Sequence, residues 1–225
     1  YGIGWKLSVE QTLKIFDAHE IKAIYTNAQG KSHYFMSNEA NADGEIPDDS
    51  GLGLIYKEKN ASICGYKTTH VLTDEKGNKM TFDAAGKLLQ LIDVHGNVSR
   101  LVYTNGKLSK VIDGNNHFAD FYYDSQNKLT KIVDNGDANR AVFYDYNTAG
   151  ELVTITYPSA ENAYSNEGVL ETKFAYDSKH RLNKVTDYTG ISYSITYDSN
   201  GRVARISCNG SVTVADNNVT TPGNI

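Results

Sequence analysis

Short segments of this chain alternate apolar and polar residues, and polar turns separate the segments. Near the N-terminus the odd positions from Trp5 to Ile15 are apolar except for Gln11, and polar residues lie between them. This period of two predicts a half-buried β-strand, because successive side chains of a strand point to opposite faces. We expect the strand to bend or break near Gln11.

The alternation continues after a short turn, at Ile21, Ala23 and Tyr25. Residues 27–30 are polar and end in glycine, which predicts a hairpin turn before the next strand. Residues 38–53 are polar and contain several acidic side chains. We expect this segment to form an exposed loop.

A unit of roughly 20 residues repeats along the rest of the chain, and such a period indicates a repeat architecture. Each unit opens with an aromatic residue and a polar one, at Phe82-Asp83, Tyr103-Thr104, Tyr123-Asp124, Tyr144-Asp145, Tyr176-Asp177 and Tyr197-Asp198. A turn marker follows within a few residues, at Gly86, Asn105-Gly106, Asn127, Ala149-Gly150, His180 and Asn200-Gly201. These aromatic, acidic and glycine residues are the candidate structural signature of the repeat.

A second polar turn follows in most units, at residues 93–97, 113–116, 134–137 and 187–190. Two turns per unit predict two strands per unit, so the six units are expected to form tandem antiparallel β-hairpins. The Asn-Gly pairs predict type I′ turns, because both central residues of that turn need a positive φ. The fourth unit is longer, and residues 159–168 suggest an enlarged loop.

Each unit also contains two apolar residues three positions apart, such as Leu88 and Leu91 or Leu182 and Val185. Strict alternation would place the two members of such a pair on opposite faces of the sheet. An extra residue inserted between them would return both to one face. The spacing therefore predicts a recurring irregularity in the strand after each first turn.

The composition agrees with an all-β fold, since 16 Tyr and 19 Gly stand against 3 Pro and a single Trp. The net charge is -5, and no basic stripe is present to neutralise a phosphate backbone, so nucleic acid is not an expected partner. No apolar run approaches the ~20 residues of a membrane helix, and membrane insertion is not expected. Tyr1 starts the sequence without the features of a signal peptide, and we interpret the chain as a fragment of a longer protein.

The repeat resembles the YD-repeat, or Rhs, proteins of bacteria, with the extracellular teneurins as more distant relatives. Tyr123-Asp124-Ser125, Tyr176-Asp177-Ser178 and the segment 197–203 look like the repeat core of that family. The segment 4–7 resembles the GW-x-L opening that precedes the repeats, and residues 30–35 and 74–83 resemble two further leader motifs. The resemblance covers nearly the whole chain.

The resemblance implies a β-rich leader at residues 1–72 and about six YD repeats at 73–225, joined in one wide, curved or spiralling sheet. In the family such a sheet is part of a hollow shell around a C-terminal toxin or effector domain. Secretion or surface location is implied in the same way. Nothing here resembles the family's C-terminal plug or self-cleavage site, so no catalytic residue is carried over.

The chemistry-bearing residues do not form a recognised site. The six histidines show no H-x-x-x-H spacing, and nucleophile-elbow, Walker A and dinucleotide-binding motifs are absent from the sequence. Most Asp residues occupy turns, where their side chains bind local backbone amides. A calcium site from Asp43, Glu45, Asp48 and Asp49 is a minor alternative without EF-hand spacing. We expect no catalytic, metal or cofactor site, and Cys64 and Cys208 are too far apart in the sequence to indicate a disulfide framework.

Three functions remain open, of which the first is favoured. In the first, the chain is a structural wall segment, and its partners are the remainder of its own polypeptide, namely further repeats and a C-terminal effector. Alternatively, its tyrosines form a curved face that binds a glycan or a surface protein, although a tyrosine ladder with bonded hydroxyls explains the recurrence more simply. The third is an enzyme acting on polysaccharide. Edge-to-edge self-association, or capping of an edge by the leader, is expected for an isolated repeat array.

Overall fold

The computed structural model describes residues 5–17, 19–51, 53–135, 140–158 and 170–208, and the backbone of 212–216. In these residues the fold is built from strands, and the one helical element is a short 3-10 turn at Ser37–Glu39. This confirms the all-β class. Within the described part of the chain, no helix has the length and apolar character needed to cross a membrane.

The strands form two sheets. The small sheet has the order β1-β2-β3, with β1 at Thr12–Ile15, β2 at Ile21–Thr26 and β3 at Ser32–Met36. The large sheet begins with β4 at Glu45–Pro47, β5 at Ile55–Ile63, β6 at Tyr66–Thr73, β7 at Lys79–Phe82, β8 at Leu88–Ile92, β9 at Val98–Thr104 and β10 at Lys107–Ile112. It continues with β11 at Phe118–Tyr123, β12 at Leu129–Asp134, β13 at Ala141–Tyr146, β14 at Leu152–Tyr157, β15 at Leu170–Tyr176, β16 at Leu182–Thr186, β17 at Ser192–Tyr197, β18 at Val203–Cys208 and β19 at Val212–Asp216.

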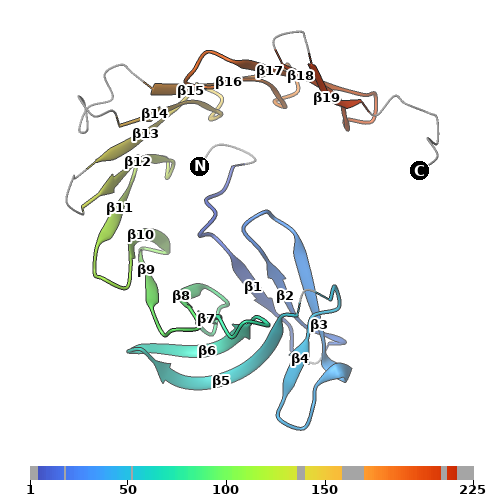
Figure 1. Cartoon of the computed structure of the whole chain (residues 1–225), viewed down its shortest axis with the longest axis vertical. Coiled ribbons are helices and arrows are strands. Elements are labelled where there is room, and N and C mark those ends of the chain that lie inside the picture. Colours follow the sequence, from blue (N-terminus) through green and yellow to red (C-terminus); the bar gives the residue numbers. More distant parts are fainter. Residues whose placement is uncertain are drawn as a thin grey trace. The chain divides into compact units, whose positions relative to one another are not determined.

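The order of strands in the large sheet is their order in the chain, from β4 to β19 (Figure 1). Adjacent strands with a defined register pair antiparallel, as in β7 with β8 and β17 with β18. The prediction of tandem antiparallel hairpins in one open sheet is therefore confirmed. β4 and β5 precede residue 73 and still belong to this sheet. The leader boundary at residue 73 and the curvature across the whole sheet stay predictions.

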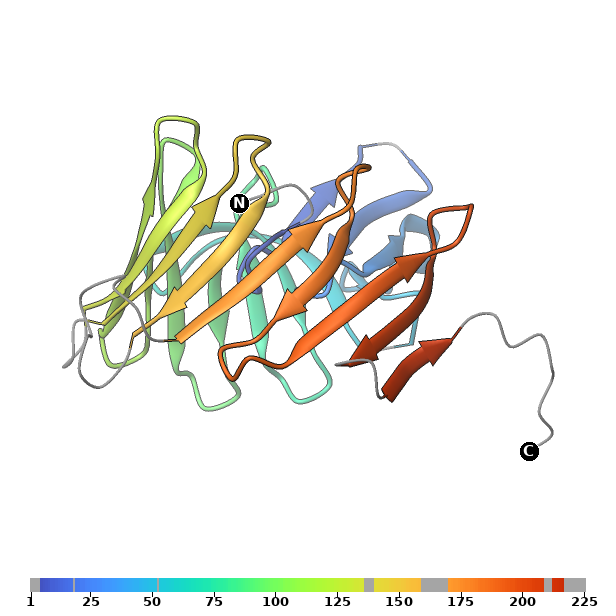
Figure 2. The same ribbon diagram turned by 90° about the horizontal axis from the view of Figure 1, so that it is seen from above.

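The chain divides into two compact units. The first unit is Lys6–Asp120, and the second unit joins Trp5 to the described residues from Phe121 onward. In each unit the strands run between two rows of turns (Figure 2).

The core of the first unit lies between the small sheet and the large one and is rich in aromatic rings. Phe35 of β3 is fully buried and its ring centroid lies 5.6 Å from that of Tyr56 of β5. Tyr25 of β2 contacts Phe82 of β7 edge to face, with centroids 6.4 Å apart. Burial raises the pKa of the Tyr25 hydroxyl to about 12. The small sheet is thus part of the core rather than an appendage.

Two predictions for the leader are corrected. The strand expected from Trp5 begins only at Thr12, because residues 8–9 form a turn in which the Glu10 amide donates to the Leu7 carbonyl. Residues 38–53 are not simply an exposed loop, since they contain the 3-10 turn and β4, and Asp48 is buried. Its carboxylate has partners beneath the surface, which a polar sequence does not reveal.

The commonest turn is a five-residue loop closed by its first side chain. At Asp83, Oδ1 accepts the amides of Ala85 and Lys87 at 2.9 Å each, and the Gly86 amide donates to the Asp83 carbonyl. This is a type I turn followed by a left-handed residue. The same bonds to the first residue's Oδ1 recur in loops that begin at Asn27, Asn41, Asp74, Asp93, Asp113, Asp124, Asp177, Asp187 and Asp198.

The type I′ prediction is right at one Asn-Gly pair and wrong at the other. Asn105 and Gly106 have φ of 51° and 80°, as that turn requires. At 200–201 only Gly201 has a positive φ, because Asp198 closes the five-residue loop instead. A second turn with two positive φ values joins β5 to β6 at Cys64-Gly65, where the sequence carries no recognisable signal.

The predicted irregularity is confirmed as a β-bulge. Phe82 pairs with Leu88 while Thr81 pairs with Gln90, which leaves Leu89 as the extra residue. Leu88 and Leu91 therefore lie on the same face of the sheet, where each is the cross-strand partner of Phe82 or Met80. Equivalent shifts follow Leu108, Leu152, Leu182 and Val203. The spacing of three in the sequence is the signature of this bulge.

The expected turn at 134–137 and the enlarged loop at 159–168 lie largely or wholly outside the described residues. Asp134 and Asn135 alone of that turn are described, and the Asp134 amide donates to the Arg140 carbonyl at 2.6 Å.

Candidate functional site

The repeated tyrosines bind the backbone of the preceding unit. The hydroxyl of Tyr103 donates to the carbonyl of Leu88 at 2.8 Å, and that of Tyr176 donates to Leu152 at 2.8 Å. Tyr197 does the same to Leu182 at 2.6 Å. In each case the accepting leucine directly follows the five-residue loop and opens the bulged strand. These tyrosines therefore fasten one hairpin to the next.

The fourth unit has a different register from the one expected from the sequence. Tyr146, not Tyr144, donates its hydroxyl to the preceding unit, at the carbonyl of Leu129 and 2.8 Å. Asn147 follows it and accepts the Glu151 amide, with Gly150 left-handed at φ 84°. Tyr144 and Asp145 lie within β13, two residues before the repeat position. Of the remaining signature residues, Tyr123 ends β11 and Asp124 closes the next loop.

A cation covers the ring of three of these tyrosines. The Lys87 ammonium lies 4.7 Å from the centroid of Tyr103. Lys128 lies 5.4 Å from Tyr146, and the Arg181 guanidinium lies 4.2 Å from Tyr197. Each cation is the last residue of a five-residue loop and directly precedes the leucine that accepts the hydroxyl. We call this pair of contacts, hydroxyl to carbonyl and cation over ring, the tyrosine clamp.

Loss of one clamp hydroxyl should destabilise the second of the two compact units, which contains the described residues from Phe121 onward. Tyr146→Phe removes the hydroxyl that donates to the carbonyl of the buried Leu129, so we expect a loss of about 1 kcal/mol in unfolding free energy. Urea unfolding followed by circular dichroism measures it. The control is Tyr122→Phe, because the Tyr122 ring is 44% exposed and already lies under Lys131. Equal effects of the two substitutions would contradict the clamp.

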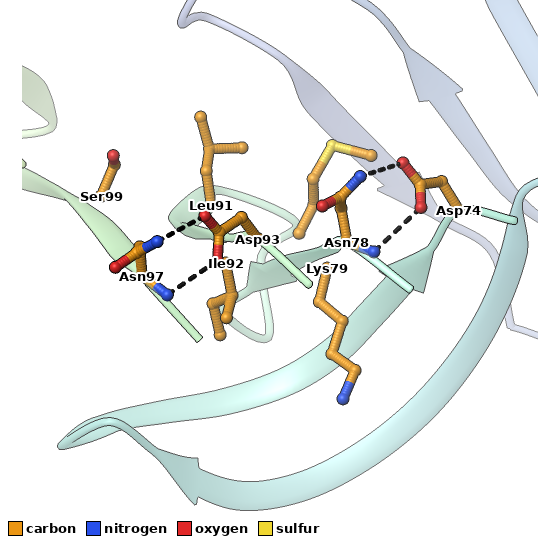
Figure 3. Close-up of a pocket in the computed structure, with 9 residues that line it drawn as sticks. Asp74, Asn78, Lys79, Leu91, Ile92, Asp93, Asn97 and Ser99 are labelled. Atoms are coloured by element: carbon orange, nitrogen blue, oxygen red, sulfur yellow. Dashed lines mark hydrogen bonds between the residues drawn. The ribbon is translucent and has the colours of Figure 1, made fainter. Parts of the chain in front are cut away.

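A groove of about 340 Å³ lies between two neighbouring loops of the first unit (Figure 3). The apolar side chains of Leu91 and Ile92 are part of its lining, and Asp74 and Asp93 each lie beside the asparagine of their own loop. Asn78 donates its side-chain amide to Asp74 Oδ2, and Asn97 does the same to Asp93, both at 2.7 Å. These bonds are the main reason why the pKa of each carboxyl is lowered.

The groove does not provide an acid and base pair. Glycoside hydrolysis needs one carboxyl with a raised pKa to protonate the leaving group. Here the pKa values of both Asp74 and Asp93 move down, and their oxygens are bound by their own loops. Asn78 Oδ1 also accepts the amide of Val94 at 2.9 Å, so it joins one loop to the next. The arrangement is that of a structural loop pair.

His33, Ser50 and Asp48 form the cluster closest to a catalytic constellation. Ser50 Oγ lies 2.8 Å from His33 Nδ1 and donates to Asp48 Oδ2 at 2.5 Å. His33 is fully buried, and Asp48 Oδ2 lies 3.5 Å from its Nδ1. A triad needs the histidine between serine and aspartate, with its unprotonated nitrogen toward the serine. Here serine lies between the other two.

The hydrogen bonds of Asn27 settle which nitrogen of His33 carries the proton. Asn27 Oδ1 accepts the amides of Gln29 and Lys31, so its Nδ2 is the group that faces His33 Nε2, at 3.3 Å. An NH₂ group can only donate, so Nε2 is the acceptor and the neutral ring carries its proton on Nδ1. Nδ1 therefore cannot take a proton from Ser50. The cluster fixes the leader and does not activate a nucleophile.

A polar cleft of about 480 Å³ is lined by Lys14, Asp17, Lys22, Glu58 and His70 among others. Lys22 and Glu58 form an ion pair at 3.2 Å. Nδ1 of the buried His70 lies 2.9 Å from the Tyr56 hydroxyl, and burial lowers the pKa of His70. One nitrogen of the ring is thus hydrogen-bonded inward to Tyr56.

The acidic residues proposed as a minor calcium site are used elsewhere. Asp48 binds Ser50, Asp49 accepts the Tyr34 amide, and Glu45 pairs with Lys57 at 3.3 Å. Among the residues that the structure describes, no three His, Cys, Asp or Glu side chains are grouped to hold a metal ion. Cys64 and Cys208 are free thiols.

No family model and no curated protein matches the sequence. A crystal structure containing TcdB2 and TccC3 aligns with 92% of this chain and 14% of that one, at 15% identity and a TM-score of 0.42. A Tc holotoxin pore of Photorhabdus luminescens aligns with 88% of this chain and 14% of that one, at 15% identity and a TM-score of 0.41. A porin-like protein from Bacteroides uniformis aligns over 91% and 92% of the two chains, at 12% identity and a TM-score of 0.40. The chain spans 14% of the length of the first two proteins, and its function has to be argued from its own residues.

Proposed function

We propose that this chain is a wall segment of a larger YD-repeat protein and that it works by forming a continuous sheet. The observation that carries the proposal is the clamp, which repeats the same bonds from one hairpin to the next at Tyr103, Tyr146 and Tyr197. A sheet in which each hairpin is fastened to its predecessor can be lengthened without a new fold. Its function is then to build a surface of fixed shape.

The larger context follows from the YD resemblance in the sequence. On this proposal the chain's partners are further repeats of its own polypeptide and an effector domain that the wall encloses or presents. The protein would then be secreted or carried on the bacterial surface. Both assignments belong to the same proposal as the wall itself.

The two edge strands of the large sheet differ, and this supports the addition of further strands at β19 rather than at β4. Near β4, the amide of Asp49 donates to the carbonyl of Tyr34 in β3, and Phe35 bridges Asp48. The small sheet thus covers the chain next to β4. Among the described strands, β19 pairs with β18 alone. The backbone of β19 therefore offers an edge to which a further strand can add.

Sedimentation velocity tests this proposal at increasing protein concentration. Through the β19 edge we expect reversible self-association, because an unpaired strand edge can pair with a strand of another chain. A parallel glycan array and a polysaccharide turnover assay should both give no saturable response. A chain that stays monomeric at high concentration, or a glycan bound with saturation, would contradict the wall assignment.

The binding alternative is less well supported by the clamp tyrosines. Their hydroxyls are bound to backbone carbonyls, and cations cover the faces that a sugar would stack on. Tyr122 and Tyr188 are the more exposed rings, at 44% and 59%. If a glycan did bind, loss of binding in Tyr188→Ala would identify this alternative.

A further inference from the structure

The repeat unit that ends at Tyr176 lacks the cation of the tyrosine clamp. Lys87, Lys128 and Arg181 precede the accepting leucines Leu88, Leu129 and Leu182, but Glu151 precedes Leu152. Glu151 is buried, and its two oxygens are held by Asn147 Nδ2 at 2.6 Å and His180 Nδ1 at 2.8 Å. A carboxylate is repelled by the negative face of an aromatic ring, so it cannot replace the missing cation.

The tyrosine of this unit receives a different partner. Tyr176 still donates its hydroxyl to Leu152, and it also accepts the indole N–H of Trp5 at 2.9 Å. Trp5 packs edge to face on Phe174, with ring centroids 4.7 Å apart and an angle of 65°. Phe174 and Tyr176 are two residues apart on β15 and share one face of the strand. All these residues belong to the second of the two compact units of the chain.

We infer that Glu151 keeps one tyrosine clamp open and thereby directs the chain's own N-terminal segment, through Trp5, to β15. The three clamps that carry a cation leave no comparable place, because their ring faces are covered. Both oxygens of Glu151 are held by Asn147 and His180, so the docking place beside Tyr176 is preformed. Among the tyrosines whose hydroxyl contacts are described above, Tyr176 alone is thus open to Trp5, and the charge of a single residue selects it. The inference rests on these contacts and does not depend on the proposed wall function.

Trp5 is the single tryptophan of the chain, so its fluorescence reports the contact directly. Glu151→Lys restores a cation beside Tyr176 and should displace the indole. We expect its emission to shift to the red and its quenching by acrylamide to rise toward that of the unfolded chain. Glu151→Gln keeps the size of the side chain without a cation. Its amide oxygen can accept from Asn147 Nδ2 and its NH₂ can donate to His180 Nδ1 when that nitrogen is unprotonated, so its emission should match that of the natural chain.

Two further variants make the outcome decisive. Tyr176→Phe removes the acceptor of the indole N–H and should also shift the emission, whether or not Glu151→Lys folds by circular dichroism. Lys128→Glu opens the clamp at Tyr146 without touching Trp5 and should leave the emission unchanged. A folded Glu151→Lys variant with the natural emission, or an unshifted Tyr176→Phe variant, would overturn the inference.

Discussion

Gly86→Asn is expected to lower the free energy of unfolding by about 3 kcal/mol, whereas Gly96→Asn should change it by about 0.5 kcal/mol or less. Both glycines are the left-handed residue of a five-residue loop, with φ of 76° and 87°. Asn occupies the same loop position at Asn116 and Asn127, so the backbone conformation itself is open to Asn. The two substitutions differ only in what the new Cβ meets.

At Gly86 the new atom meets the backbone of β1. An ideal Cβ would lie 1.6 Å from the carbonyl oxygen of Leu13, while at Gly96 no atom lies within 4 Å. The Leu13 amide also donates to the Gly86 carbonyl at 3.0 Å, and Thr12 bridges Lys87. Relief of the clash therefore requires β1 to leave the loop and the buried Leu13 side chain to lose its packing.

Urea unfolding of the two variants measures the difference, and hydrogen exchange locates it. Gly86→Asn should expose the Leu13 amide to exchange, and Gly96→Asn should not. Equal stabilities, or a Leu13 amide that stays protected in Gly86→Asn, would show that β1 does not rest on this loop.

The sequence predicts the repeated elements well because their signals are local. Asp, Gly and Asn in the loops act within five residues, and the spacing of three between Leu88 and Leu91 contains the bulge directly. The fourth unit is misplaced by the sequence pattern because Tyr144-Asp145 and Tyr146-Asn147 both resemble a unit start. The spacing between the first residue of the loop and its glycine distinguishes them. Gly86 is three positions after Asp83, and Gly150 is three positions after Asn147 but five after Asp145.

The contacts that define the candidate sites are long-range, and the sequence gives no signal for them. Trp5 and Tyr176 are 171 residues apart. The cation of the clamp could have been found as a basic residue before Leu88, Leu129 and Leu182, but its target is the tyrosine of the next repeat unit. His33 looks like an ordinary polar residue in the sequence, because nothing in its segment shows that Asp48 lies buried against it. Tertiary packing alone creates that pair.

Asn27→Asp is expected to lower the free energy of unfolding by about 2 kcal/mol. Asp fits the loop, since Asp83 and Asp124 close the same turn. The change places a carboxylate oxygen where the Asn27 amide now donates to His33 Nε2. A neutral imidazole has one N–H, yet His33 would then face the new carboxylate at Nε2 and the oxygens of Asp48 and Ser50 at Nδ1. One of these buried contacts then lacks a donor between its oxygens and the ring, so the substitution should destabilise the leader.

Urea unfolding measures the loss in Asn27→Asp. Asp124→Asn, which makes the reverse exchange in a loop without a histidine partner, should change the free energy of unfolding by less than about 0.5 kcal/mol. In a His33→Gln background, Asn27→Asp should cost much less than in the natural chain, because the imidazole that faces the new carboxylate is gone. A cost of the same size in that background would mean that the effect arises elsewhere in the loop.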